Sequence, residues 1–192
     1  HSAKFSGGKS LQALMHYYKK GFVIGADIID KKFLDRKNLK TIKIDQNSQK
    51  DLKRIGKEFN YFDLIIDDGS HFPDHQKKTF KVLFNYLSND GIYVIEDMKS
   101  SYRRGYGGDP NLGKNNLVEY FSNFIHLTNS ETLLDKYINK KFKNIGQIYF
   151  MNAAIVIKKI KKKHKLVSKK DLYKSYKEFD SRKTKKGYVL LN

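Results

Sequence analysis

The chain alternates short apolar runs with longer segments in which apolar residues recur at helical spacing. Strands are expected at residues 22–27, 41–45, 62–68 and 91–97. Helices are expected at residues 8–20, 49–59 and 75–87. Because strand and helix segments alternate, the pattern predicts an α/β fold with a doubly wound, mostly parallel sheet.

The pattern changes after the fourth expected strand. A further helix is expected at residues 114–127, followed by two strands at residues 145–150 and 153–160. Only Met151 and Asn152 separate these two strands, so they are predicted to form an antiparallel pair at the edge of the sheet.

The first residues have the character of a loop that opens a helix. Gly7 and Gly8 precede the first helical segment, whereas a doubly wound fold usually has a strand ahead of such a glycine loop. We therefore expect a catalytic domain over residues 1–160 that lacks its first strand, and a basic extension over residues 161–192.

The positive charge is concentrated near the end of the chain. The 192 residues include 39 Lys and Arg against 20 Asp and Glu, a formal net charge of +19, and residues 158–192 alone hold 14 basic and 3 acidic residues. Only five basic residues are arginines, the side chain usually chosen for bidentate contacts with phosphate and guanine. Specific recognition of nucleic acid is therefore disfavoured, although a lysine-rich arm for RNA stays an alternative.

Other classes are excluded by composition. The chain has no Cys, which rules out disulfides, zinc–thiolate sites, iron–sulfur clusters and a thiol nucleophile. No apolar run approaches the roughly 18 residues of a transmembrane helix, and the N-terminus lacks a signal-peptide stretch. We expect a cytoplasmic protein whose chemistry uses oxygen and imidazole groups.

Acidic residues follow all four expected strands of the first part of the chain. They are Asp27, Asp45, the pair Asp67 and Asp68, and the pair Glu96 and Asp97. In open α/β sheets, ligands bind at the carboxyl ends of the strands. Each acid alone is well explained as a helix cap or turn residue, but six at one edge favour a divalent cation or shared protons.

The segment from Asp67 to His71 carries the most specific chemistry. Gly69 allows a sharp turn that brings Asp68 and His71 toward one point, and the next strand supplies Glu96 and Asp97. Three oxygen donors, Asp68, Glu96 and Asp97, suit Mg²⁺ or a similar hard cation such as Mn²⁺. His71 is a candidate general base, the alternative being a structural histidine, whereas His75 is expected on the following helix.

The first two acids fit a nucleotide-like ligand. An acid at this position of a dinucleotide-binding half holds ribose hydroxyls, and Asp27 follows the glycine loop by about 20 residues. Asp45 and Gln46 are placed to reach the adenine end of the same ligand. The glycine-rich, aromatic segment at residues 100–110 is a candidate lid over a substrate, the alternative being a plain surface loop.

These motifs together resemble a known family. Residues 66–71, 91–97 and 101–108 are similar to the metal-dependent sugar O-methyltransferases of the mycinamicin and macrocin type, which are class I S-adenosylmethionine-dependent methyltransferases. The resemblance extends over roughly residues 7–158, but the family's first strand and the start of its glycine motif are missing.

The resemblance implies a role for each matching position. It implies Mg²⁺ ligands at Asp68, Glu96 and Asp97, and a base at His71, with Asp67 or Asp68 as competitors. The implied S-adenosylmethionine contacts are Gly7, Gly8, Ser10, Asp27, Asp45, Gln46 and Asp67.

The implied activity is methyl transfer to a sugar hydroxyl. Heavy use of Lys, Asn and Ile is typical of an AT-rich genome, so a cell-surface polysaccharide sugar or its nucleotide-sugar precursor is expected rather than a macrolide. A homo-oligomer is compatible with the sequence. The alternatives are an RNA methyltransferase that uses the lysine-rich tail, and a non-catalytic domain of a larger glycan enzyme.

Overall fold

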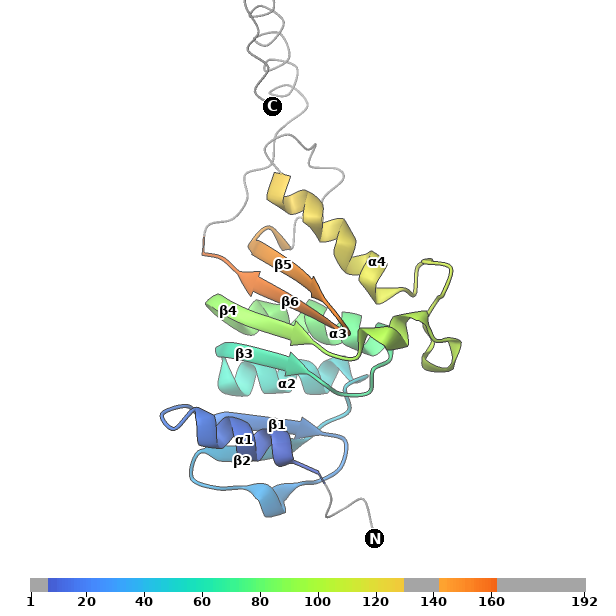
Figure 1. The fold of residues 1–192 in the computed structure, drawn as a ribbon. Helices are drawn as coiled ribbons and strands as arrows, with labels where there is room; N and C mark the ends of the chain where they lie inside the picture. Colours follow the sequence, from blue (N-terminus) through green and yellow to red (C-terminus); the bar gives the residue numbers. More distant parts are fainter. Residues whose placement is uncertain (1–6, 130–141, 162–192) are drawn as a thin grey trace, which may run out of the picture.

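The strands follow the predicted order in the computed structural model, which describes residues 7–129 and 142–161. They are β1 (Val23–Asp27), β2 (Leu39–Lys43), β3 (Phe62–Asp67), β4 (Leu87–Ile95), β5 (Ile145–Met151) and β6 (Ala154–Lys159). The pairs β1–β2 and β3–β4 are parallel, and β6 pairs antiparallel with both β4 and β5 (Figure 1). The α/β fold of parallel strands with an antiparallel hairpin at its edge is confirmed.

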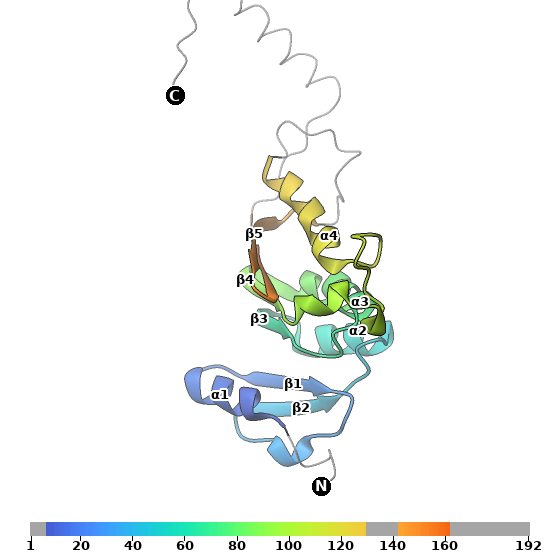
Figure 2. The same ribbon diagram turned by 45° about the vertical axis from the view of Figure 1, so that its right-hand side comes forward.

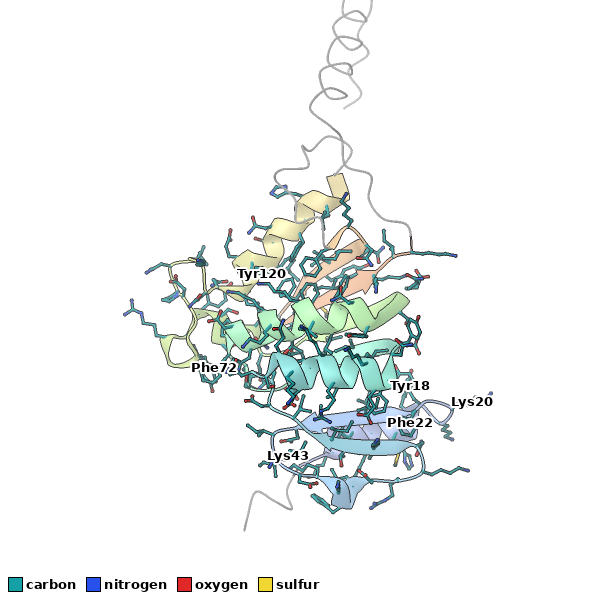
Figure 3. All side chains as sticks on the ribbon, turned by 180° about the vertical axis from the view of Figure 1, so that it is seen from behind. Tyr18, Lys20, Phe22, Lys43, Phe72 and Tyr120 are labelled. Atoms are coloured by element: carbon teal, nitrogen blue, oxygen red, sulfur yellow. The ribbon has the colours of Figure 1, made fainter. Side chains whose placement is uncertain are left out.

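Helices lie on both sides of the strands. The α-helices are α1 (Lys9–Tyr17), α2 (Gln49–Phe59), α3 (Pro73–Leu83) and α4 (Leu117–Ser122). The short 3₁₀ helices are η2 (Lys32–Leu34), η3 (Phe84–Tyr86), η4 (Met98–Tyr102), η5 (Arg104–Tyr106) and η6 (Asn123–Asn129). Helices α2 and α3 cover one face of the strands, and α1 lies on the opposite face against β1 and β2 (Figures 1 and 3).

The described strands form two separate sheets. One contains β1 and β2, and the other has the order β3–β4–β6–β5, so that β1 and β3 each have an edge that pairs with no described strand (Figure 2). The usual doubly wound order places a strand at this position. No strand within residues 7–129 and 142–161 joins the two sheets.

An aromatic cluster forms the core between α3, α4 and the larger sheet. The Phe80 ring is fully buried and contacts Phe84, Tyr93 and Phe121 at centroid distances of 4.9, 5.3 and 4.8 Å. Edge-to-face and tilted pairs of this kind are favourable beyond the apolar area that they bury. The cluster holds α3 in place, and with it the turn that precedes α3.

Most element boundaries differ from the prediction by one to four residues; for example, α1 ends at Tyr17 rather than residue 20, and β2 spans Leu39–Lys43 rather than residues 41–45. Strand β4 begins at Leu87 rather than residue 91, because Leu87 pairs with Phe62 across an irregularity in β3. Helix α3 begins at Pro73, a residue favoured in the first turn because its missing N–H is not needed there. The helix expected at residues 114–127 is divided into α4 and the 3₁₀ helix η6.

The basic extension expected at residues 161–192 lies outside the described residues, apart from Lys161. Among the helices of the described segments, none is long and apolar enough to cross a membrane.

Candidate metal and acceptor site

The carboxyl ends of the parallel strands lie at one edge of the fold, as do the first residues of α1 (Figure 1). Asp27 and Asp67 are the last residues of β1 and β3, and Glu96 directly follows β4. Asp45 comes two residues after the end of β2. The predicted placement of the acids at strand ends therefore holds, although β2 and β4 end before their acids.

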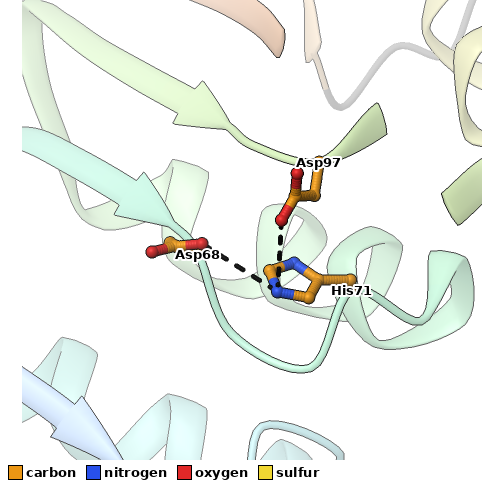
Figure 4. Close-up of side chains that lie close together, drawn as sticks. All are labelled: Asp68, His71 and Asp97. Atoms are coloured by element: carbon orange, nitrogen blue, oxygen red, sulfur yellow. Dashed lines mark ion pairs between the residues drawn. The ribbon is translucent and has the colours of Figure 1, made fainter. Parts of the chain in front are cut away.

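Asp68, His71 and Asp97 converge on one point (Figure 4). One ligand atom from each lies within 4.8 Å of the others. Nε2 of His71 is 3.5 Å from Oδ2 of Asp97 and 4.0 Å from Oδ1 of Asp68. Both carboxylates are more than half exposed, whereas the His71 side chain is three-quarters buried. Solvent or a ligand can therefore reach the carboxylates beside an imidazole that is held in place.

The backbone explains how two strand ends present these side chains to one another. His71 and Asp97 have φ values of 59° and 54°, in the left-handed region that few non-glycine residues adopt. The strand ends are also joined, because the Glu96 N–H donates to the Asp67 carbonyl at 3.1 Å. Left-handed residues that the surrounding structure holds in place occur often at functional sites.

Glu96 lies outside the group of three but interacts with it electrostatically. Its partial burial, together with the negative charges of Asp68 and Asp97, raises the pKa of Glu96 above its ordinary range. Its carbonyl accepts a hydrogen bond from Nε2 of the fully buried Gln76 at 3.0 Å. A bound cation would relieve the repulsion among the carboxylates of Asp68, Glu96 and Asp97.

The donor set fits a hard divalent cation. Asp68 and Asp97 supply carboxylate oxygens, which are the ligands that Mg²⁺ and Mn²⁺ prefer, and their exposed side leaves positions for water or substrate. Glu96 is outside this group but close enough to interact electrostatically with both carboxylates. The geometry also permits His71 to be a ligand, since Nε2 faces the same point. Its other ring nitrogen, Nδ1, is buried without a hydrogen-bond partner among the described residues.

Asp67 has a different environment from its neighbour Asp68. Its side chain is 5% exposed, Oδ1 accepts from Nε2 of Gln46 at 2.6 Å, and Oδ2 accepts from the buried Tyr93 hydroxyl at 3.4 Å. Burial raises the pKa of Asp67 to about 7. Both of its oxygens are occupied inside the protein, and this arrangement favours a supporting role over that of a base that contacts substrate.

The expected cofactor residues lie at the same edge of the fold. Gly7 and Gly8 both have positive φ, and Gly8 is the N-cap of α1, with Ser10 exposed in the first turn. Exposed Asp27 and Asp45 each use one carboxylate oxygen in a local turn, to the N–H groups of Ile29 and Asn47. The structure thus keeps these five residues accessible to a ligand.

The side chain of His75 contacts two residues of its own segment, Ser70 and Phe72. It lies in α3, where Nδ1 is 2.8 Å from the Ser70 hydroxyl and its ring stacks at 5.2 Å on Phe72. Phe72 lies at the end of the fold that carries the acids (Figure 3). Its ring also contacts Tyr106 of η5 at 5.8 Å, and both rings are partly exposed. The loop over residues 100–110 therefore flanks the site.

Sequence reasoning missed three residues that support the site. Tyr93 was expected only as part of a buried strand, and no local signal predicts its bond to Asp67. Gln76 lies on the buried face of α3, where a polar residue among apolar ones is itself a signal. Asn116 caps α4 by accepting from the Glu119 N–H, and Asn-x-x-Glu is the pattern of a capping box.

Two curated proteins are similar to more than half of the chain. Demethylmacrocin O-methyltransferase of Streptomyces fradiae is 38% identical over 112 residues, which cover 58% of this chain and 28% of that protein. Mycinamicin VI 2''-O-methyltransferase of Micromonospora griseorubida is 41% identical over 102 residues, 53% of this chain and 26% of that protein. No family model matches the chain.

Solved structures extend the similarity to most of the described residues. The MycE methyltransferase of the mycinamycin biosynthetic pathway, in complex with Mg, SAH and mycinamycin VI, matches with a TM-score of 0.73 and 30% identity, over 81% of this chain and 41% of that one. A second crystal form of the same enzyme, with Mg and SAH, matches with a TM-score of 0.77 and 28% identity. This match covers 90% of this chain and 46% of that one. The resemblance to macrolide sugar O-methyltransferases and their fold is confirmed, for a chain that spans less than half the length of these relatives.

Proposed function

We propose that this chain carries the catalytic site of an S-adenosylmethionine-dependent and metal-dependent O-methyltransferase that acts on a sugar hydroxyl. The observation that carries the proposal is the convergence of Asp68, His71 and Asp97 at the carboxyl edge of the strands. It is supported by the similarity to enzymes named as O-methyltransferases of demethylmacrocin and mycinamicin VI, and to a methyltransferase solved with Mg and SAH.

Asp68, Glu96 and Asp97 would hold Mg²⁺ or Mn²⁺. When bound, the cation supplies a positive charge that orients the acceptor hydroxyl and lowers its pKa. The three carboxylates fix where that charge lies relative to His71, because they come from the ends of neighbouring strands β3 and β4. Loss of any one of them would weaken cation binding and leave the other two repelling one another.

His71 would take the proton of the acceptor hydroxyl at Nε2, the nitrogen that faces Asp68 and Asp97. The acceptor oxygen then forms a bond to the methyl carbon while the bond from that carbon to the sulfonium sulfur breaks. The products are the methyl ether, S-adenosylhomocysteine and a protonated imidazole. General-base help of this kind contributes about 10²–10⁴-fold. Asp67 remains the competing base, although its burial and its two hydrogen bonds disfavour it.

The methyl donor would bind beside the start of α1. Gly7, Gly8 and Ser10 lie where helix N–H groups and flexible backbone can approach a carboxylate. Asp27 is placed for ribose hydroxyls, and Asp45 for the adenine side. Alignment of donor and acceptor in one geometry supplies most of the remaining rate enhancement.

The acceptor class is a sugar hydroxyl with a second hydroxyl nearby. The names of the relatives point to sugars on macrolide glycosides, whereas the AT-rich composition favours a cell-surface polysaccharide or a nucleotide-activated sugar. A screen with isotopically labelled S-adenosylmethionine separates these sources: it should include a deoxysugar glycoside, a nucleotide-sugar and a polysaccharide. Labelled product from one class and not from the others identifies the acceptor.

The central test is methyl transfer with and without the cation. Methyl transfer should require Mg²⁺ or Mn²⁺ and should disappear when a chelator is added. The Asp68→Ala variant should lose methyl transfer, whereas calorimetry should still detect binding of S-adenosylhomocysteine to it. Activity that survives both the chelator and Asp68→Ala would overturn the proposed mechanism.

Two alternatives make different predictions. An RNA methyltransferase would show salt-sensitive RNA binding that is lost when residues 161–192 are deleted. A non-catalytic domain would not bind S-adenosylhomocysteine at all. The division at residue 160, a cytoplasmic location and a homo-oligomer stay predictions.

A further inference from the structure

We propose that Gln46 is a positioning residue for the metal site, rather than a contact to the cofactor as its position in the sequence suggests. The inference rests on the proposed function, because it concerns the cation that Asp68, Glu96 and Asp97 would hold. Gln46 does not itself face that cation; it acts through the segment from Asp67 to His71.

Both the nitrogen and the oxygen of the Gln46 side-chain amide form hydrogen bonds. Nε2 donates to Oδ1 of Asp67 at 2.6 Å, and Oε1 accepts from the Ser70 N–H at 2.8 Å. It also packs against the Gly69 backbone, since a Cβ at Gly69 would come within 2.5 Å of Oε1. One amide that follows the end of β2 therefore connects the last residue of β3 with two residues of the turn after it.

These contacts hold the backbone next to the residues that face the metal site. Asp67 and Ser70 flank Asp68 in the sequence, and His71 follows Ser70 directly. Fixing the two flanking positions restricts the backbone on which Asp68 and His71 project toward Asp97. Gln46 thus determines the shape of the turn without being one of its residues.

The same network reaches the neighbouring strand. Asp67 accepts from the Tyr93 hydroxyl of β4 at 3.4 Å, and the Asp67 carbonyl accepts from the Glu96 N–H at 3.1 Å. Glu96 and Asp97 are the residues that β4 brings to the site. A displacement of Asp67 would therefore shift Asp68, which follows it, and also Glu96 and Asp97, which follow β4.

The polarity of the contacts makes this position chemically specific. The residue at position 46 must donate to a carboxylate and accept from an N–H, which a glutamine amide does and an apolar side chain of the same length does not. Partners outside the immediate ligands typically change metal affinity by about 10–100-fold. Gln46→Met, which preserves length and volume, should weaken cation binding by a factor in that range.

The test measures two affinities separately. A titration with Mn²⁺ alone, in which electron paramagnetic resonance detects the free ion, gives the affinity for the cation. Calorimetry gives the affinity for S-adenosylhomocysteine. Wild-type protein should bind Mn²⁺, and Gln46→Met should bind it about 10–100-fold more weakly. Both should bind S-adenosylhomocysteine alike. The control is Thr41→Val, which removes the partly buried bond from the Thr41 hydroxyl of β2 to Asp35, away from the site, and should leave Mn²⁺ binding unchanged.

A polarity swap supplies the rescue. In Gln46→Glu the new carboxylate faces that of Asp67, and Mn²⁺ binding should fall. The double variant Gln46→Glu with Asp67→Asn exchanges the two groups. The amide introduced at position 67 can donate to the carboxylate introduced at position 46 while its carbonyl accepts from Tyr93, and that carboxylate still accepts from the Ser70 N–H. Mn²⁺ affinity should return to near the wild-type value, and this comparison stands even if Gln46→Met fails to fold.

The outcomes separate the two proposals. Wild-type binding of Mn²⁺ with no weakening in folded Gln46→Met, or with no recovery in the folded double variant, overturns the positioning role. Loss of S-adenosylhomocysteine affinity with unchanged Mn²⁺ affinity overturns it in favour of a direct cofactor contact. If the folded wild-type chain does not bind Mn²⁺, the proposed metal site is wrong, and so is the positioning role of Gln46.

Discussion

Nε2 of His71 lies 3.5 Å from Oδ2 of Asp97, across the ends of two neighbouring parallel strands. Both residues have left-handed backbone conformations, so each side chain turns from its own segment toward the other. With Asp68 beside them, an imidazole and two carboxylates face one small volume. This relationship places a candidate base next to the oxygens that would hold a cation.

The first prediction concerns His71. His71→Ala should lower the rate of methyl transfer by about 10²–10⁴-fold, since the acceptor hydroxyl loses its general base. Binding of S-adenosylhomocysteine should be nearly unchanged, because His71 faces the acidic residues rather than the start of α1. Initial rates with labelled methyl donor and calorimetry measure the two effects. The matched control is His126→Ala, which removes an exposed histidine of η6 and should retain full activity.

The second prediction concerns binding of the cation to the folded protein. A cation at 100 times its dissociation constant should stabilise the fold by about 2.7 kcal/mol. Asp68→Asn with Asp97→Asn should abolish this gain, whereas Asp63→Asn, which changes an exposed acid near the opposite end of β3, should preserve it. Thermal unfolding with and without Mn²⁺ measures the difference. An equal gain in the double variant would place the cation elsewhere.

The fold was largely predictable because local pattern and global arrangement agree. Helix α2 was predicted with its observed bounds, since Ser48 is a favourable N-cap and Leu52 and Ile55 recur on one face. The hairpin of β5 and β6 was predicted from two apolar runs with almost no linker. The start of β4 was missed because Ser88 and Asp90 are typical of turns, whereas here the Ser88 hydroxyl bonds to Asp63 and the Phe62 carbonyl of β3.

The sequence predicted that Asp68, His71 and Asp97 meet at one point, but it also predicted Glu96 there and did not predict the residues that support the site. Acids after apolar runs can be found from the sequence, and parallel strands bring them to one edge. The contacts of Gln46 join it to residues 21 and 24 positions away, and such contacts depend on how strands are ordered. Sequence alone therefore placed Gln46 toward the cofactor, while its amide is occupied by Asp67 and Ser70.

The third prediction is a pH dependence of stability that originates from Asp67. Burial raises its pKa from 3.8 to about 7 in the folded protein, so the folded state retains a proton that the unfolded chain loses near pH 4. The contribution of Asp67 to stability is therefore largest below about pH 4 and is lost as pH rises toward about 7. Each pKa unit corresponds to about 1.4 kcal/mol, which limits the total effect to about 4 kcal/mol.

Asp67→Asn should remove this dependence, since the amide does not ionise. Urea unfolding of both proteins at pH 5 and pH 8, in the presence of chelator, measures the change. The wild-type protein should lose more stability than the variant between these two values. Equal losses in both proteins would show that Asp67 ionises normally in the fold.

The last prediction concerns the anchor of the loop that flanks the site. Asn116 is fully buried; its Nδ2 donates to the carbonyls of Ser101 and Asp109 at 3.3 and 3.0 Å, while its Oδ1 accepts from the Glu119 N–H at 3.0 Å. Asn116→Asp keeps the cap of α4 but removes both donated bonds and brings a carboxylate toward two carbonyl oxygens. The expected loss of stability is about 1–3 kcal/mol or more, because buried carbonyls lose their partner.

The loop should then open more often than the rest of the fold. Trypsin cleavage after Arg103 and Arg104, which are exposed within this loop, should accelerate in Asn116→Asp relative to cleavage after Lys57 at the end of α2. Mass spectrometry of the early fragments gives both rates. If the two rates rise together, the effect of Asn116 is on global unfolding, whereas selective cleavage of the loop shows that Asn116 holds this segment beside Phe72 and the acidic residues.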